Sequence, residues 1–229
     1  MQAVQPRIFE FCRELMEIVA DTVFSEDESD ILHEVMNIAF GSAAADLAGI
    51  LDIYVVLNVP TIKVLKAKDL VNYLRNEITG YERISIVEQN FIAKFKGIAL
   101  LVFPAGIGKS LIALLGSDPD DSILSDPMGT LESETLLEVG NILVGACVGK
   151  IAELLGDTMI YSPPRLIIEN LPQKALTSDM FDPGKLAIIL QTVFRFKDQD
   201  IKGSLFLICS HDSLDWLKKA LYEFMRQYE

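Results

Sequence analysis

Cysteine and histidine are scarce in this chain of 229 residues, which contains three cysteines and two histidines. Cys12, Cys147 and Cys209 are odd in number and widely separated, so they form neither a disulfide framework nor a zinc-binding pattern. His33 and His211 are isolated and lack metal-ligand spacing. We therefore expect a cytoplasmic protein with reduced thiols that binds no cofactor or metal ion itself.

Basic residues are also in deficit, with 20 Lys and Arg against 33 Asp and Glu and a net charge of −13. An acidic chain without a basic block repels phosphate backbones, which argues against nucleic acid as a partner. The longest uncharged apolar run, Gly97–Gly108, is too short to cross a bilayer. The N-terminus lacks the pattern of a signal peptide. We expect no membrane insertion.

Apolar residues make up 50% of the chain, which is enough to bury a sizeable core. An internal repeat is the most informative feature, because residues 32–60 align without a gap with residues 136–164 after a shift of 104 positions. The identical pairs are Leu32/Leu136, Glu34/Glu138, Val35/Val139, Asn37/Asn141, Ile38/Ile142, Gly41/Gly145, Ala48/Ala152, Leu51/Leu155 and Pro60/Pro164. The chain is therefore interpreted as one duplicated unit.

Hydrophobic periodicity predicts the elements of one unit. We expect a long helix over residues 30–51, a strand over 52–65, a short helix over 67–76, two antiparallel strands over 84–103 and a short helix near residue 116. Pro60 lies inside the first strand and lacks an N–H, so that strand should be an edge strand, bulged or broken there. The second unit repeats the order from about residue 131 to residue 222.

The predicted fold is a single α+β domain over residues 1–229 with pseudo-two-fold symmetry. Residues 26–116 and 131–229 are the two repeats, joined by a linker rich in Asp, Ser and Pro. Residues 1–25 add an amphipathic helix that we expect to pack on the domain. Each repeat should give strands to a shared, largely antiparallel sheet, with the two long repeat helices on one face.

Each long helix carries one polar stripe, because its members are spaced three or four residues apart. The stripes consist of Asp30, Glu34 and Asn37 in the first repeat and Glu134, Glu138 and Asn141 in the second. The neighbouring Ile31, Val35 and Ile38 can bury, so the polar stripe should face outward. A solvated helix face would explain any single glutamate. Asparagine is a poor helix former, however, and its recurrence in both repeats favours a functional role.

Asparagine limits the chemistry that such a stripe can perform. Its amide cannot act as a general base near neutral pH, but it donates and accepts hydrogen bonds with fixed geometry and can hold a water molecule. A neighbouring carboxylate can pair with a cation on a partner. The stripe supplies no nucleophile, metal-binding cluster or histidine base, so the substrate must bring its own electrophile and metal. In some phosphoryl-transfer enzymes a glutamine orients the attacking water in this way.

The spacing Asp30-x3-Glu34-x2-Asn37-x22-Pro60 resembles the signature of the CheC/CheX/FliY phosphatases of bacterial and archaeal chemotaxis. The second repeat carries the signature again, with Glu134 at the leading position, where the family has Asp or Ser. The matching residues there are Glu138, Asn141 and Pro164. Two copies are more similar to CheC, which has two sites, than to CheX, which has one.

The resemblance implies a hydrolase that removes the aspartyl phosphate from CheY or a related response-regulator receiver domain, with Mg²⁺ held by the receiver. Glu34 or Glu138 would pair with the receiver's active-site lysine. Asn37 or Asn141 would orient water for in-line attack. The supporting residues would be Asp30, Glu134, Pro60 and Pro164, the prolines more by shaping a strand end than by touching the substrate.

The resemblance leaves a second function open, a non-catalytic receiver-binding adaptor related to the flagellar switch proteins that share this fold. The presence of both asparagines favours the enzyme, since an adaptor would not need them. The receptor deamidase CheD, which CheC-type proteins bind, is a further partner that the resemblance suggests.

Overall fold

The computed structural model describes residues 23–51, 54–78, 83–114, 130–169, 182, 185–196 and 201–226. The elements of the first repeat are α2 (Glu26–Leu51), β1 (Val55–Leu57), β2 (Thr61–Lys66), α3 (Ala67–Glu77), β3 (Ile84–Ile92), β4 (Lys96–Pro104) and α4 (Ile107–Leu114). Those of the second are α6 (Thr130–Leu154), β5 (Ile160–Tyr161), β6 (Arg165–Glu169), β7 (Leu186–Phe196), β8 (Lys202–Ser210), the 3-10 turn η2 (His211–Ser213) and α8 (Leu214–Met225).

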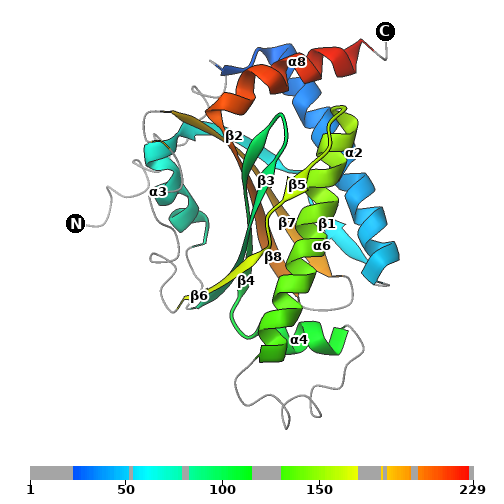
Figure 1. Cartoon of the computed structure of the whole chain (residues 1–229), viewed down its shortest axis with the longest axis vertical. Coiled ribbons are helices and arrows are strands. Elements are labelled where there is room, and N and C mark those ends of the chain that lie inside the picture. The colour runs from blue at the N-terminus through cyan, green and yellow to red at the C-terminus, as the bar shows by residue number, and fades with distance from the viewer. Residues whose placement is uncertain are drawn as a thin grey trace, which may run out of the picture.

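The strands form one eight-stranded sheet in the order β1-β7-β8-β4-β3-β5, with β2 also paired to β7 and β6 also paired to β3. Every described pairing is antiparallel. The long helices α2 and α6 lie side by side against one face of the sheet, as Figure 1 shows. The predicted α+β class, with the two long repeat helices on one face, is confirmed.

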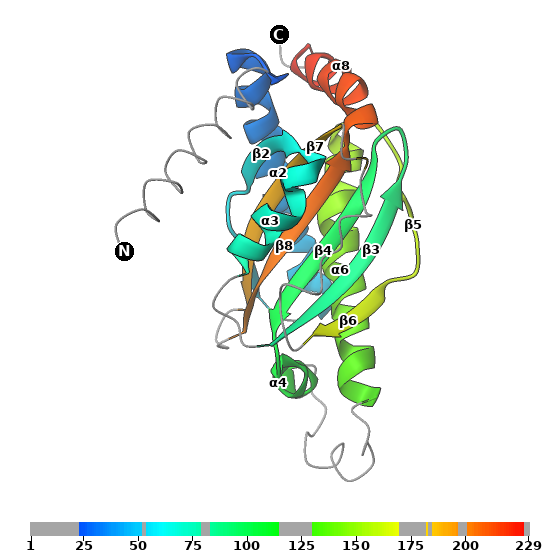
Figure 2. The ribbon, with the colours of Figure 1, turned by 90° about the vertical axis from the view of Figure 1, so that its left-hand side faces the viewer.

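Both faces of the central strands are covered. On β8, Leu205 and Leu207 face the core under α2 and α6, whereas Phe206 and Ile208 pack with α3 on the other side. Figure 2 shows α3 crossing this second face. Successive residues of a strand point to opposite faces, so a strand covered on both sides reads as a continuous apolar run.

The two repeats exchange elements. Strands β1 and β2 of the first repeat pair with β7 of the second, and β5 and β6 of the second repeat pair with β3 of the first. Helix α4, which follows β4, packs on α6, and α8, which follows β8, packs on α2. The arrangement is therefore pseudo-two-fold, with β4 and β8 paired at its centre.

One ion pair marks the pseudo-two-fold axis between the long helices. Lys150 Nζ of α6 lies 3.1 Å from Asp46 Oδ2 of α2. The shift of 104 positions that defines the repeat aligns Asp46 with Lys150, so each residue faces its own counterpart. The helices run in opposite directions past this point (Figure 1).

The strand that contains Pro60 is broken there, as predicted. Strand β1 ends at Leu57 and β2 begins at Thr61, and both lie at the edge of the sheet on β7. The same break separates β5 from β6 around Pro164. A proline cannot donate to the ladder, so the interruption falls at the same repeat position in both halves.

Helix α2 begins at Glu26, four residues before the predicted start. The backbone N–H of Ser25 donates to Glu28 Oε2 at 2.9 Å, and that of Glu28 donates to Ser25 Oγ at 3.1 Å. This reciprocal pair is a capping box, a start signal that the periodicity missed. The predicted short helix near residue 116 is α4. The predicted helix within residues 1–25 and the linker between the repeats lie almost wholly outside the described residues.

Helix α6 is the one described helix that is long and apolar enough to cross a membrane. It is a core helix instead. Its side chains Val139, Leu143, Val144 and Val148 are at most 1% exposed, packed against the sheet and α2.

Candidate functional site

The polar stripes of both long helices face outward. Asp30, Glu34 and Asn37 are exposed on α2, while Val35 on the adjacent stripe is fully buried. The corresponding residues of α6, Glu134, Glu138 and Asn141, are exposed too. The predicted orientation is confirmed, and the roles of these residues remain predictions.

The expected burial of Ile38 is wrong. Ile31 is half-buried, but Ile38 is 38% exposed, because one more helical turn carries the apolar stripe around to the surface beside Asn37. Ile38 is therefore an apolar contact available to a visiting protein at the edge of the polar stripe.

The four stripe carboxylates, Asp30, Glu34, Glu134 and Glu138, form no ion pair with any described residue. A carboxylate in this state is available to pair with a cation brought by a partner.

The two asparagines lie far apart on the helix pair. Each lies nine residues before the member of the Asp46–Lys150 pair on its own helix. With a rise of 1.5 Å per residue, each is roughly 13 Å from the axis, in opposite directions. A partner bound at one asparagine therefore contacts a different end of the helix pair from a partner bound at the other.

In the second site a buried strand residue holds the asparagine. Gln89 of β3 is 2% exposed and donates from Nε2 to Asn141 Oδ1 at 2.7 Å. The same Nε2 donates to the backbone carbonyl of Ser162 at 3.0 Å. Ser162 lies in the strand break two residues before Pro164, so the structure brings together the asparagine and the proline-containing segment of the predicted signature.

The first site has a different strand residue at this position. Thr192 of β7 is 2% exposed, and its Oγ1 donates to the carbonyl of Asn58, the counterpart of Ser162, at 2.7 Å. The Asn37 side chain has no hydrogen-bond partner among the residues that the structure describes. The sequence analysis identified neither Gln89 nor Thr192, because both lie far from the signature in the chain.

Both prolines lie in the strand breaks, between β1 and β2 and between β5 and β6. Pro60 is buried and Pro164 is half-buried. The backbone N–H of Asn58 donates to Val193 and that of Ser162 donates to Asn90, each at 3.0 Å. These bonds hold the two breaks against β7 and β3 in the same way.

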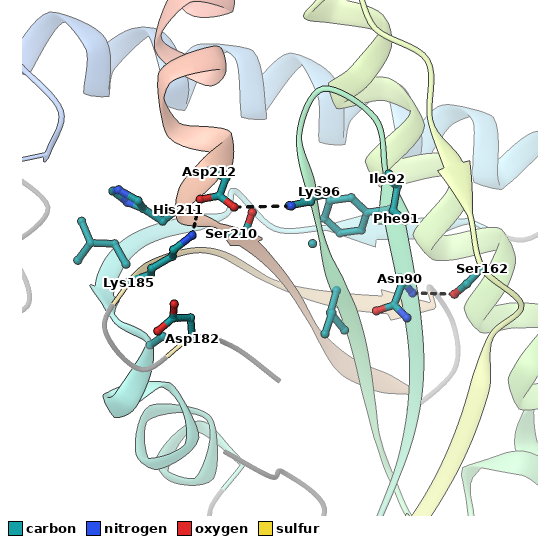
Figure 3. A pocket seen from close by; sticks show the side chains of 14 residues that line it. Asn90, Phe91, Ile92, Lys96, Ser162, Asp182, Lys185, Ser210, His211 and Asp212 are labelled. Atoms are coloured by element: carbon teal, nitrogen blue, oxygen red, sulfur yellow. Dashed lines mark hydrogen bonds and ion pairs between the residues drawn. The ribbon is translucent and has the colours of Figure 1, made fainter. Parts of the chain in front are cut away.

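A cavity of about 410 Å³ lies away from the stripes, and none of the eight predicted site residues lines it. Asp212 forms ion pairs there with Lys185 at 2.8 Å and Lys96 at 3.6 Å (Figure 3). The hydrogen bond from Lys185, together with Lys96, holds the pKa of the Asp212 carboxyl below its ordinary value. Asp182 also lines the cavity, so its two lysines and two aspartates balance in charge. Across the described ranges, no group of three or more His, Cys, Asp or Glu could hold a metal ion.

No family model matches the chain. It is 26% identical over 202 residues to the CheY-P phosphatase CheC of Bacillus subtilis (strain 168), a match that covers 86% of this chain and 94% of that protein. The crystal structure of Thermotoga maritima FliY has a TM-score of 0.60 at 23% identity, covering 90% of this chain and 100% of that one. The FliM middle domain of Vibrio alginolyticus has a TM-score of 0.53 at 14% identity, covering 82% and 98%. At these identities the two structures show a shared fold alone.

Proposed function

The chain belongs to the CheC/CheX/FliY family, and on that premise we propose that it is a cytoplasmic phosphatase that hydrolyses the aspartyl phosphate of CheY or a related receiver domain. One observation carries the proposal. At two equivalent helix positions, an exposed asparagine amide stands one turn from an exposed glutamate that has no ion-pair partner among the described residues. The CheD contact that the resemblance suggests stays a prediction.

The reaction needs little from this chain beyond positioning. Glu34 or Glu138 pairs with the receiver's lysine and fixes the docking, and Asn37 or Asn141 aims a water molecule at phosphorus. The water oxygen forms the new P–O bond while the bond to the receiver's aspartate breaks, which regenerates the carboxylate and releases inorganic phosphate. The water's proton passes to phosphate or solvent, since an amide cannot accept it. Mg²⁺ bound by the receiver neutralises the phosphoryl charge.

The test is the double substitution Asn37→Ala with Asn141→Ala. Correct orientation of a reacting group can be worth several kcal/mol, so phosphate release should slow by on the order of 100-fold or more. The measurement is phosphate release from a receiver phosphorylated with a small phosphodonor. Asn72→Ala is the matched control, because Asn72 is an exposed asparagine on α3, on the opposite face of the sheet. Wild-type turnover by the folded double variant would refute the mechanism.

A non-catalytic receiver-binding adaptor is the second candidate. The fold that the chain shares with the FliM middle domain favours it. The adaptor and the enzyme should both bind a receiver activated with beryllofluoride. Only the enzyme accelerates phosphate release, so the same assay separates the two.

A further inference from the structure

Gln89 is a buried polar residue in a strand whose neighbouring residues pack in the core. It lies on β3, and its amide nitrogen bridges the Ser162 carbonyl and Asn141 Oδ1. We propose that Gln89 is a positioning residue that locks the Asn141 amide in one orientation and makes the second site the faster of the two. This inference rests on the proposed function.

The orientation of the two amides follows from the backbone. The Ser162 carbonyl oxygen can only accept a hydrogen bond, so the group of Gln89 that faces it at 3.0 Å must be the NH₂. The second hydrogen of that NH₂ points to Asn141, so the atom that it meets at 2.7 Å must be Oδ1. One unambiguous acceptor in the main chain therefore fixes both side chains.

The hydrogen bond from Gln89 leaves the other hydrogen-bonding groups of the Asn141 amide available to water and substrate. An amide oxygen has two lone pairs, and Gln89 uses one, so the other can accept a hydrogen bond from the attacking water. Both hydrogens of Asn141 Nδ2 remain available to phosphoryl oxygens. The Asn141 side chain is thus fixed in one orientation before the receiver binds. Binding then costs less side-chain conformational entropy.

The first site lacks this support for two reasons. Its strand residue is Thr192, whose hydroxyl donates to Asn58, and the structure records no bond from it to Asn37. The helix residue before the asparagine also differs, because Met36 is buried in α2 where α6 has Gly140. A methyl group on Gly140 would lie 2.7 Å from Val87 Cγ1, so glycine allows α6 to approach β3 closely.

Gln89 is an unfavourable choice for structure alone. Its Oε1 is buried and accepts no hydrogen bond from any residue in the described part of the chain. Burying an amide oxygen without a partner is unfavourable. Thr192 shows that a shorter side chain can make the equivalent bond to the strand break without leaving such an oxygen. The longer amide is needed only to reach Asn141.

The experiment isolates each site before altering Gln89. Asn37→Ala leaves only the second site, and Asn141→Ala leaves only the first. In the Asn37→Ala protein, Gln89→Thr should lower kcat on the order of tenfold and leave KM for the phosphorylated receiver nearly unchanged, because it acts on orientation rather than docking. In the Asn141→Ala protein the same substitution should leave kcat unchanged. Gln89→Met, which keeps the volume but removes both donated bonds, should reproduce the first result if Gln89→Thr fails to fold.

A second readout does not depend on activity. The side-chain NH₂ hydrogens of Gln89 are both donated, so their resonances, assigned by their loss in Gln89→Thr, should exchange with solvent more slowly than those of exposed Asn37. They should exchange faster in Asn141→Ala, which removes the acceptor of one of them. An unchanged kcat in the second-site protein, or an equal loss in both single-site proteins, overturns the inference. A wild-type protein that releases no phosphate overturns the proposed function instead, and the resonances then decide alone whether Gln89 orients Asn141.

Discussion

At the scale of single residues, the two asparagines are placed for access rather than for packing. Both lie in the interior of long helices, where asparagine is less favourable than alanine by roughly 0.5 kcal/mol. Asn37 has no hydrogen-bond partner among the described residues to offset this cost, whereas Asn141 accepts one hydrogen bond from the buried Gln89. The exposed Ile38 beside Asn37 adds a small apolar surface to the polar stripe of α2.

The buried thiols allow a chemical test of the core. Burial raises the pKa of the Cys147 and Cys209 thiols to about 12. At pH 8 both are therefore protonated, and since the thiolate is the reactive form, neither should react with a thiol reagent in the native state. In a Cys12→Ser protein, we expect no thiol to be modified by a disulfide reagent at pH 8 until denaturant is added, when both react. Rapid labelling without denaturant would mean that the core opens readily.

The sequence predicted the exposed residues of the sites better than the buried ones. The outward stripe of Asp30, Glu34 and Asn37 followed from helical spacing next to a buried Val35. Gln89 could not be found in this way. It lies 52 residues from Asn141, and the contact depends on which strand runs beneath α6, which local periodicity does not state.

At the scale of elements, the glycines of the long helices fall into two kinds. Gly41 and its repeat counterpart Gly145 lie one turn after the asparagines, and a methyl group on either would meet no atom within 4 Å. Packing therefore does not require them. Gly140 differs, because Val87 of β3 occupies the space that a side chain would need.

This difference predicts opposite effects of one substitution. Gly41→Ala should raise the free energy of unfolding by roughly 0.5–1 kcal/mol, because alanine loses less conformational entropy in a helix. Gly140→Ala should lower it by about 1–3 kcal/mol, because the helix and strand must separate. Denaturant unfolding of the two single variants measures both changes. If both variants were stabilised, the close contact between α6 and β3 would not exist in solution.

The element boundaries were predictable where side-chain chemistry interrupts a pattern. Pro60 predicted the broken edge strand, because the missing N–H has a local effect. The start of α2 was missed by four residues, because Ser25 and Glu28 act through hydrogen bonds rather than periodicity. The order of the strands in the sheet could not be predicted from the sequence. Both Leu65 and Val64 of β2 are buried, and nothing local indicates that their partner is β7 rather than β3.

At the scale of the whole molecule, the exchange of elements links the two repeats. Each repeat gives its edge strands to the other repeat's hairpin, and each terminal helix packs on the other's long helix. Neither repeat contains a complete core, since α2 and α6 contribute to the same cluster. We propose that residues 1–229 fold as one domain.

The corresponding prediction concerns fragments. Residues 1–116 and residues 131–229, produced separately, should each lack cooperative thermal unfolding, because each exposes strands whose partners are missing. When the two fragments are mixed in equal amounts, they should regain a single thermal unfolding transition. Circular dichroism measures the unfolding in each case. A fragment that unfolds cooperatively by itself would show that the repeats are autonomous domains.

The Asp46–Lys150 pair has a consequence for how such a chain could have arisen. A homodimer of a single ancestral half would set two identical side chains against each other at the axis, either two aspartates or two lysines, and like charges repel. In a single chain the two positions can differ, and here they form an attractive pair. The pair is partly exposed, so its contribution to stability is small, but it penalises self-assembly of either half and thereby favours the heterotypic match. A half expressed alone would therefore pair with itself more readily if its charged residue at this position were replaced by a neutral one.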